Sequence, residues 1–101
     1  MSRNGMRPVH PGEILREDYL AELGMSANAL AKALHVPAPR INDIVLERRG
    51  VTADTALRLA RYFDTTPQFW LNLQTAYDLC RAEIEAGGRV EREVAVMPKA
   101  A

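Results

Sequence analysis

The segment from Ser26 to Arg49 constrains the fold most strongly, because residues typical of helix starts and helix ends lie close together in it. Ser26 is a typical helix N-cap. His35 stands at a tight turn, where a positive φ is often required and His tolerates it better than most residues. Residues 37–39 read Pro-Ala-Pro, which suits a first helical turn because those N–H groups lack intrahelical partners. The segment therefore predicts two short helices joined by a tight turn. The expected inward positions are Ala29, Leu30, Ala33 and Leu34 on the first helix and Ile41, Ile44 and Val45 on the second.

Similar signals predict three further helices. Pro11 and Glu13 favour a helix start, and Gly24 favours its end as a left-handed residue. Thr52 and Thr66 are candidate N-caps of two later helices. The three helices are expected at about residues 11–23, 53–63 and 67–86, with Gly87-Gly88 ending the last one. The buried side of the helix after Thr52 is expected at Ala56, Leu57, Leu59, Ala60 and Phe63.

Together these signals predict an all-α fold, a five-helix bundle with short loops. A chain of this length indicates a single domain over residues 1–101, with its core at about residues 10–86. Residues 1–9, which include Arg3 and Arg7, are expected to be a short flexible arm. Such an arm can reach into a minor groove, but a disordered terminus is the preferred interpretation. Residues 89–101 are compatible with a short strand, a helix remnant or a disordered tail.

The composition and the N-terminal sequence indicate in which cellular compartment the protein is expected. Hydrophobic residues make up 48% and charged residues 26% of the 101 residues, which is ordinary for a folded protein. No apolar run approaches the roughly 20 residues of a membrane span, and the N-terminus has no hydrophobic signal core. We therefore expect a cytoplasmic protein that has no contact with a membrane. Cys80 is the single cysteine and cannot form an internal disulfide.

Charge is distributed unevenly along the chain, although the net charge is zero. Residues 26–63 hold six basic and three acidic residues, a net charge of +3, whereas residues 64–101 hold four basic and six acidic residues, a net charge of −2. This distribution fits a local footprint for nucleic acid better than a non-specific polycation. Charge alone decides little, because many charged stretches are only solvated helix faces.

The sequence contains no pattern typical of an enzyme. It has no His/Cys set at metal-ligand spacing, no nucleophile paired with a base and no glycine-rich phosphate loop. His10 and Glu13 have no third ligand nearby and are explained by the start of a helix. We therefore expect no catalysis, no cofactor and no bound metal.

The two helices between residues 26 and 49 have the layout of a DNA-binding helix-turn-helix. Side chains near the start of the second helix would meet base edges in the major groove. Arg40 can bond guanine and Asn42 can bond adenine, whereas Asp43 can accept from cytosine but more simply orients Arg40. The alternative is a merely solvated face. The candidate DNA-binding residues are Ala38, Pro39, Arg40, Asn42 and Asp43 for bases and Ser26, Arg48 and Arg49 for phosphates.

Four segments carry a resemblance to a known family: MRPVHPGEILRE (6–17), ALAKALHVP (29–37), RINDIV (40–45) and VTADTALRLARYFDTTPQFWLNLQTAYDL (51–79). With them the chain resembles the HigA-type antitoxins of the Xre/Cro-like helix-turn-helix proteins. The resemblance implies a lambda-repressor-like homodimer that binds a palindromic operator in its own promoter. It also implies neutralisation of a HigB-type toxin, a RelE-like mRNA endonuclease. Two departures from the family pattern are His35, where Gly is common, and the sequence Leu46-Glu47-Arg48-Arg49-Gly50 at the end of the recognition helix.

Two other functions remain open from the sequence. One is a stand-alone Xre-family transcriptional regulator without a toxin partner, and the other is a protein-interaction module that does not bind DNA. The dimer surface is expected on the last helix and the residues after it, because Trp70, Leu73 and Tyr77 exceed the obvious needs of a small core. The alternative is that these side chains close the core of one protomer.

Overall fold

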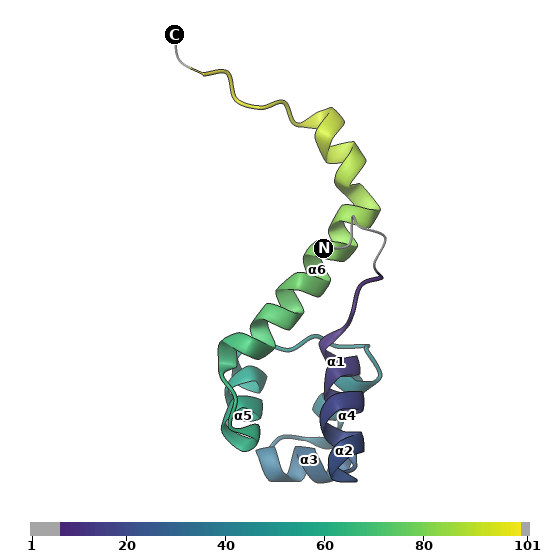
Figure 1. Ribbon diagram of the computed structural model, residues 1–101, viewed down its shortest axis with the longest axis vertical. Helices are drawn as coiled ribbons and strands as arrows, with labels where there is room; N and C mark the ends of the chain where they lie inside the picture. Colours follow the sequence, from purple (N-terminus) through teal and green to yellow (C-terminus); the bar gives the residue numbers. More distant parts are fainter. Residues whose placement is uncertain (1–6, 100–101) are drawn as a thin grey trace.

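The computed structural model describes residues 7–99, and every regular element within them is helical. The first helix is continuous through α1 (Pro11–Ile14), η2 (Leu15–Leu20) and α2 (Ala21–Leu23). It is followed by α3 (Ala27–Leu34), α4 (Ala38–Val45), α5 (Ala53–Phe63) and α6 (Pro67–Glu93). Figure 1 shows the helical segments before α6 gathered at one end of the molecule and α6 rising from them. The predicted all-α class and five-helix layout are confirmed for these residues.

The helix ends follow from local side-chain chemistry. Ser26, Thr52 and Thr66 each accept the backbone N–H of the residue three positions later, as predicted for N-caps. Gly24 and His35 close their helices in the left-handed region, at φ values of 61° and 60°. The interpretation of His35 as a positive-φ turn residue is therefore confirmed.

The π-helical segment η2 was not predicted from the sequence. Its bonds include the N–H of Ala21 donating to the carbonyl of Arg16, five residues back. An α-helix would place Leu15 and Leu20 about 140° apart, yet both are buried. The wider turn brings these two leucines to the same side of the helix, so the π segment serves the core.

The core lies among the first helix, α3, α4, α5 and the start of α6. Trp70 is completely buried, with its ring 5.1 Å from that of Tyr19 and 6.2 Å from that of Phe63. Trp70 therefore belongs to the core of one protomer and not to a dimer surface. Leu57 is 59% exposed and Ala29 is also exposed, contrary to the inward positions expected for them. The other buried apolar residues of this cluster are Leu15, Leu20, Leu30, Ala31, Leu34, Ile41, Ile44, Val45, Val51, Ala56, Leu59 and Ala60.

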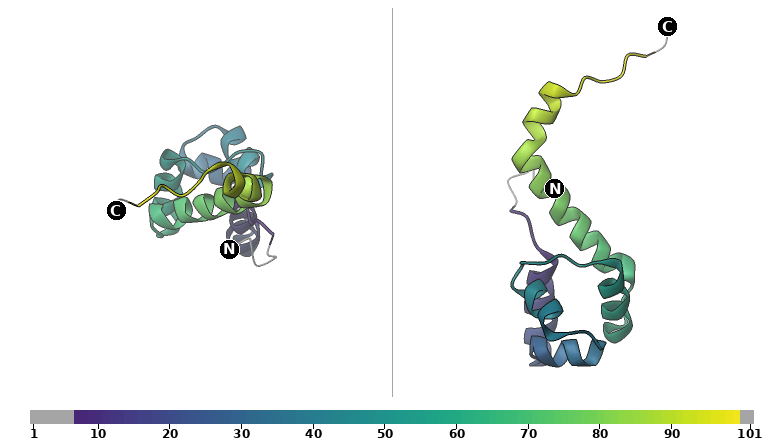
Figure 2. Two further views of the ribbon diagram at one scale, coloured as in Figure 1. Left: turned by 90° about the horizontal axis from the view of Figure 1, so that it is seen from above. Right: turned by 180° about the vertical axis from the view of Figure 1, so that it is seen from behind.

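The helix α6 extends far beyond the bundle, as Figure 1 and the right view of Figure 2 show from opposite sides. The described molecule measures 58 × 27 × 20 Å, and its radius of gyration of 17.0 Å exceeds the about 13 Å of a compact domain of this length. Cys80 is the last buried residue of α6. No helix within residues 7–99, α6 included, is long and apolar enough to cross a membrane.

The predicted end of this helix at Gly87-Gly88 is wrong. Both glycines are helical, neither has a positive φ, and the helix continues to Glu93. A helical glycine costs only about 1 kcal/mol relative to alanine, and the i,i+4 ion pair of Arg89 with Glu93 spans the next turn. Of the three possibilities for residues 89–101, the described part is thus a helix remnant to Glu93, and residues 94–99 have no regular secondary structure. The predicted arm falls mostly on residues 1–6, which lie outside the described residues.

Candidate nucleic-acid interface

The helices α3 and α4 pack against each other through buried side chains, as a helix-turn-helix requires. Ile41, Ile44 and Val45 form the buried stripe of α4, as predicted. The first turn of α4 is open on the other side: Pro39 is exposed and Arg40 is half-buried, whereas the half-buried Ala38 packs against the core. The first turn of α4 therefore presents side chains to solvent at the position where a recognition helix meets DNA.

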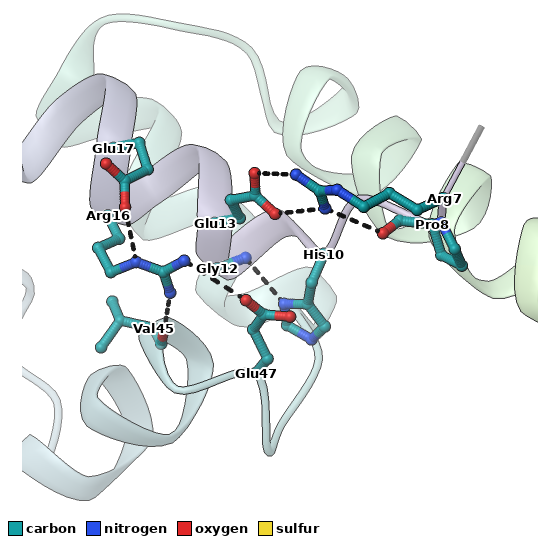
Figure 3. A network of polar contacts seen from close by, with 9 residues as sticks. All are labelled: Arg7, Pro8, His10, Gly12, Glu13, Arg16, Glu17, Val45 and Glu47. Carbon is teal, nitrogen blue, oxygen red and sulfur yellow. Dashed lines mark hydrogen bonds and ion pairs between the residues drawn. The ribbon is translucent and has the colours of Figure 1, made fainter.

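The first helix holds α4 from behind. Gly12 is buried, and a Cβ at this position would come within 1.8 Å of the Ile44 carbonyl oxygen. Arg16 donates to the Val45 carbonyl, one of the last in α4, and lies 3.5 Å from the Glu47 carboxylate. Figure 3 shows this arginine reaching across from the first helix to the end of α4. The recognition helix is therefore fixed to the first helix by a close backbone contact and a charged cap.

His10 forms the start of that first helix. Its Nδ1 accepts the N–H of Gly12 at 2.8 Å, and its ring meets the Tyr77 ring of α6 edge-on at 4.8 Å. Burial lowers the pKa of His10 below its ordinary value, which keeps the ring neutral and able to accept. Nearby, Arg7 donates both Nη groups to Glu13 at 2.8 and 2.7 Å (Figure 3). Arg7 is therefore bonded to the first helix, whereas the sequence predicts it in a flexible arm.

The partner of Arg40 differs from the one expected. Arg40 Nη1 donates to Asp54 Oδ2 at 2.6 Å, across the gap between α4 and the first turn of α5. The same Asp54 oxygen accepts from Arg58 Nε at 3.0 Å, and Arg58 Nη1 donates to the Leu34 carbonyl at 2.9 Å. These four residues form a continuous chain of bonds through α4, α5 and α3. The two arginines lower the pKa of Asp54, Arg58 first and Arg40 second, so the carboxylate stays charged near neutral pH.

The expectation that Asp43 orients Arg40 is therefore wrong. Asp43 instead faces the basic pair after α4, at 3.5 Å from Arg49 Nη2 and 3.8 Å from Arg48 Nε. The chain turns sharply there, because Glu47 adopts a left-handed φ of 63°. This turn brings both arginines back beside Asp43, a placement that sequence spacing alone does not indicate.

Asn42 is bound within the motif. Its Nδ2 donates to Asn28 Oδ1 of α3 at 2.7 Å and to the Ala38 carbonyl at 3.0 Å. The amide therefore links the two helices of the motif, and its two donors are already engaged. Asn28 was not among the sequence candidates, although it lies two residues after the Ser26 cap and is exposed.

The loop between α4 and α5 is anchored to α6. Gln74 Oε1 accepts the N–H of Val51 at 2.7 Å, and a Cβ on Gly50 would approach this amide within 2.8 Å. A hollow of about 230 Å³ lies beside the loop and is lined by Arg40, Arg49, Gly50, Thr52, Asp54 and Thr55. The structure thus brings Arg40 and Arg49 to one concave surface, whereas Ser26 lies at the start of α3.

A family model described as helix-turn-helix matches residues 15–70, which is more than half of the chain. The chain belongs to the helix-turn-helix family. The resemblance to HigA-type antitoxins of the Xre/Cro-like branch is also confirmed. The chain is similar to the antitoxin HigA of Pseudomonas aeruginosa, solved with the higBA promoter, with a TM-score of 0.88 and 53% identity over 91% of this chain and 100% of that one. This likeness also confirms the lambda-repressor-like arrangement implied by the resemblance.

The chain is also similar in sequence to two proteins that are not named as antitoxins. The virulence-associated protein I of Dichelobacter nodosus is 67% identical over 81 residues, covering 80% of this chain and 75% of the relative. The uncharacterised transcriptional regulator YbaQ of Escherichia coli K12 is 40% identical over 94 residues, covering 93% of this chain and 81% of the relative. The matches therefore extend well beyond the two helices of the motif.

Proposed function

We propose that this chain is an antitoxin that represses its own operon by binding a palindromic operator as a homodimer. The observation that carries the proposal is the open first turn of α4, with Arg40 held at its surface by Asp54. The likeness to a HigA antitoxin solved with promoter DNA supports it. A protein acting on its own operon works in the cytoplasm, which is the compartment we propose.

In this proposal the first turn of α4 enters the major groove. Arg40 bonds guanine, and Ala38 and Pro39 contact thymine methyl groups. Asn42 can accept through its Oδ1, but it bonds adenine in the bidentate manner only after releasing an Nδ2 bond. The phosphates are bound by Ser26 with the N–H groups at the start of α3 and by Arg48 and Arg49, and Asp43 sets the position of this basic pair.

The homodimer is proposed to form along the outer part of α6. Leu79 and Val90 lie on one side of the helix and are each 51% exposed, and Val94, the C-cap, is 66% exposed. Exposed apolar side chains in a row indicate a surface that another molecule covers. Two copies would present two α4 helices to successive major grooves, about 34–36 Å apart.

Operator binding is tested with the DNA upstream of the chain's own gene. We expect this duplex to bind tightly and a shuffled duplex of the same composition to bind at least 100-fold more weakly, because specific sites typically exceed non-specific ones by about 10³ or more. The affinity is measured by fluorescence anisotropy at several salt concentrations, since phosphate contacts give a linear fall of log affinity with log salt. Equal affinity for both duplexes would exclude selective repression.

The second part of the proposal is neutralisation of a HigB-type toxin, a RelE-like mRNA endonuclease. It is tested by co-expressing this chain with the product of the adjacent gene. We expect expression of the neighbour alone to arrest growth and degrade mRNA, and co-expression to relieve both and to yield a stable complex.

A stand-alone transcriptional regulator is the second candidate. The observation that favours it is the match to YbaQ, a regulator, over 93% of this chain. The two candidates differ in the co-expression experiment. A regulator without a toxin partner would bind the upstream duplex selectively but neither relieve growth arrest nor retain the neighbouring product during purification.

A further inference from the structure

The side chain of Arg40 is held by residues outside α4. It is 31% exposed, and its Nη1 is bonded to Asp54. Asp54 is itself held by Arg58, and Arg58 is fixed to the carbonyl at the end of α3. The guanidinium therefore has a defined place before any DNA is present.

We propose that Asp54 is a positioning residue for base readout, which holds Arg40 so that its Nε and Nη2 donors face a guanine. This inference rests on the proposed operator binding. An arginine has donors on three nitrogens in a planar fork, and a bidentate bond to guanine O6 and N7 needs two of them on one edge. With Nη1 engaged by Asp54, the edge formed by Nε and Nη2 is the one that remains for the base.

The same arrangement reduces binding to DNA of other sequences. A free arginine at the surface binds any phosphate, because that contact is electrostatic and independent of sequence. The carboxylate of Asp54, which also pairs with Arg58, partly offsets the charge of Arg40 and keeps its guanidinium from turning toward the DNA backbone. Asp54 therefore raises the ratio of operator binding to random binding.

Asp43 cannot take this role in its place. It lies three residues after Arg40 on the same helix but faces Arg48 and Arg49 instead. The acid that sets the readout is thus supplied by α5, outside the two helices of the motif. A substitution of Asp54 in the first turn of α5 would therefore alter the selectivity for the operator, although Asp54 itself bonds no base.

The test uses 7-deazaguanine, which lacks the N7 acceptor, placed at each guanine of the operator half-site in turn. In the wild-type chain we expect one guanine position whose replacement weakens binding by roughly 2- to 12-fold, about half of a bidentate pair on a logarithmic scale, because guanine O6 still accepts its bond. Arg40→Ala should abolish this sensitivity. Asp54→Ala should reduce it to less than half of the wild-type factor on a logarithmic scale, and should bind random DNA more tightly, with a salt slope steeper by about one.

A double variant separates positioning from a general effect on the fold. In the Arg40→Ala background, Asp54→Ala should leave the ratio of operator affinity to random-DNA affinity unchanged, because Asp54 acts on that ratio only through Arg40. Asp54→Asn, which keeps an oxygen to accept from Arg40, should retain more sensitivity than Asp54→Ala. The matched control is Asp18→Ala, which removes an exposed aspartate of η2 and should leave selectivity unchanged. Thermal unfolding of each variant verifies that it is folded at the temperature of the assay.

The outcomes distinguish this inference from the function on which it rests. If the wild-type chain does not prefer the upstream duplex, the proposed function and this inference both fail. If it does prefer that duplex but folded Asp54→Ala keeps the full 7-deazaguanine effect, only the role of Asp54 is overturned. The same conclusion holds if Asp18→Ala changes selectivity as much as Asp54→Ala.

Discussion

Gly12 of the first helix lies so close to Ile44 of the recognition helix that a Cβ on the glycine would come within 1.8 Å of the Ile44 carbonyl oxygen. This carbonyl is backbone and cannot move aside as a flexible side chain would. The glycine is thus required here for a close approach of two helices and not for an unusual φ.

Gly12→Ala should therefore destabilise the chain, by about 1–3 kcal/mol or more from overpacking. Urea unfolding followed by circular dichroism measures the change. The matched control is Gly87→Ala in the outer part of α6, where the new Cβ would have its nearest neighbour at 4.0 Å. That variant should gain up to about 1 kcal/mol from helix propensity. Equal effects of the two alanines would contradict the proposed close contact.

Stability should depend on pH through His10. Burial lowers the pKa of this ring in the folded state, although Glu47 and Asp78 oppose the shift. The unfolded chain then binds the proton more readily, so the contribution is complete above the ordinary pKa of about 6.5 and decreases as the pH falls below it. His10→Asn keeps a capping side chain without a titrating group and should show less loss of stability between about pH 7.5 and 5.5. Identical pH profiles of the two proteins would contradict this assignment.

Arg40 and Arg49 should contribute to DNA binding in different ways. Arg40→Ala should lower operator affinity by roughly 5- to 150-fold with a smaller effect on random DNA, as the loss of one base contact predicts. Arg49→Ala should weaken both duplexes by a similar factor and reduce the salt slope by about one. Equal losses on operator and random DNA for Arg40→Ala would contradict its role in base readout.

The proposed dimer should depend on the apolar side of α6. Leu79→Glu combined with Val90→Glu places two charges about three turns apart on that side and should yield monomers. Light scattering during gel filtration gives the mass. Arg92→Glu, on the opposite side of α6, is the control and should leave the mass unchanged. A double variant that remains dimeric would exclude this surface.

Much of the fold was predictable from local chemistry. Caps such as Ser26 and Thr52, and the turn at His35, depend on residues within a few positions, so their roles are visible in the sequence. Local sequence also explains the wrong prediction of a helix end at Gly87-Gly88. A glycine pair ends a helix only when no nearby interaction supports the helix. The π segment was not predictable from a 3.6-residue period, because it arises from where Leu15 and Leu20 must pack.

The residues of the candidate site were predictable from the sequence, but their hydrogen-bond partners were not. Arg40 and Asn42 are recognisable from their place near the start of the second helix. Their partners, Asp54 and Asn28, are each separated from them by 14 residues and lie on other helices. Sequence spacing favours neighbours on one helix, and for this reason it predicts Asp43 as the partner of Arg40. Only tertiary packing decides which acid reaches which arginine.

The length of α6 has a consequence for the operator. Its 27 residues give a helix about 40 Å long, which is comparable to the distance between successive turns of a major groove on one side of DNA. In a dimer joined along the outer turns of α6, the helix acts as a spacer between two reading units. Removing or adding a turn would change the half-site separation that the protein accepts, without altering any residue that meets a base.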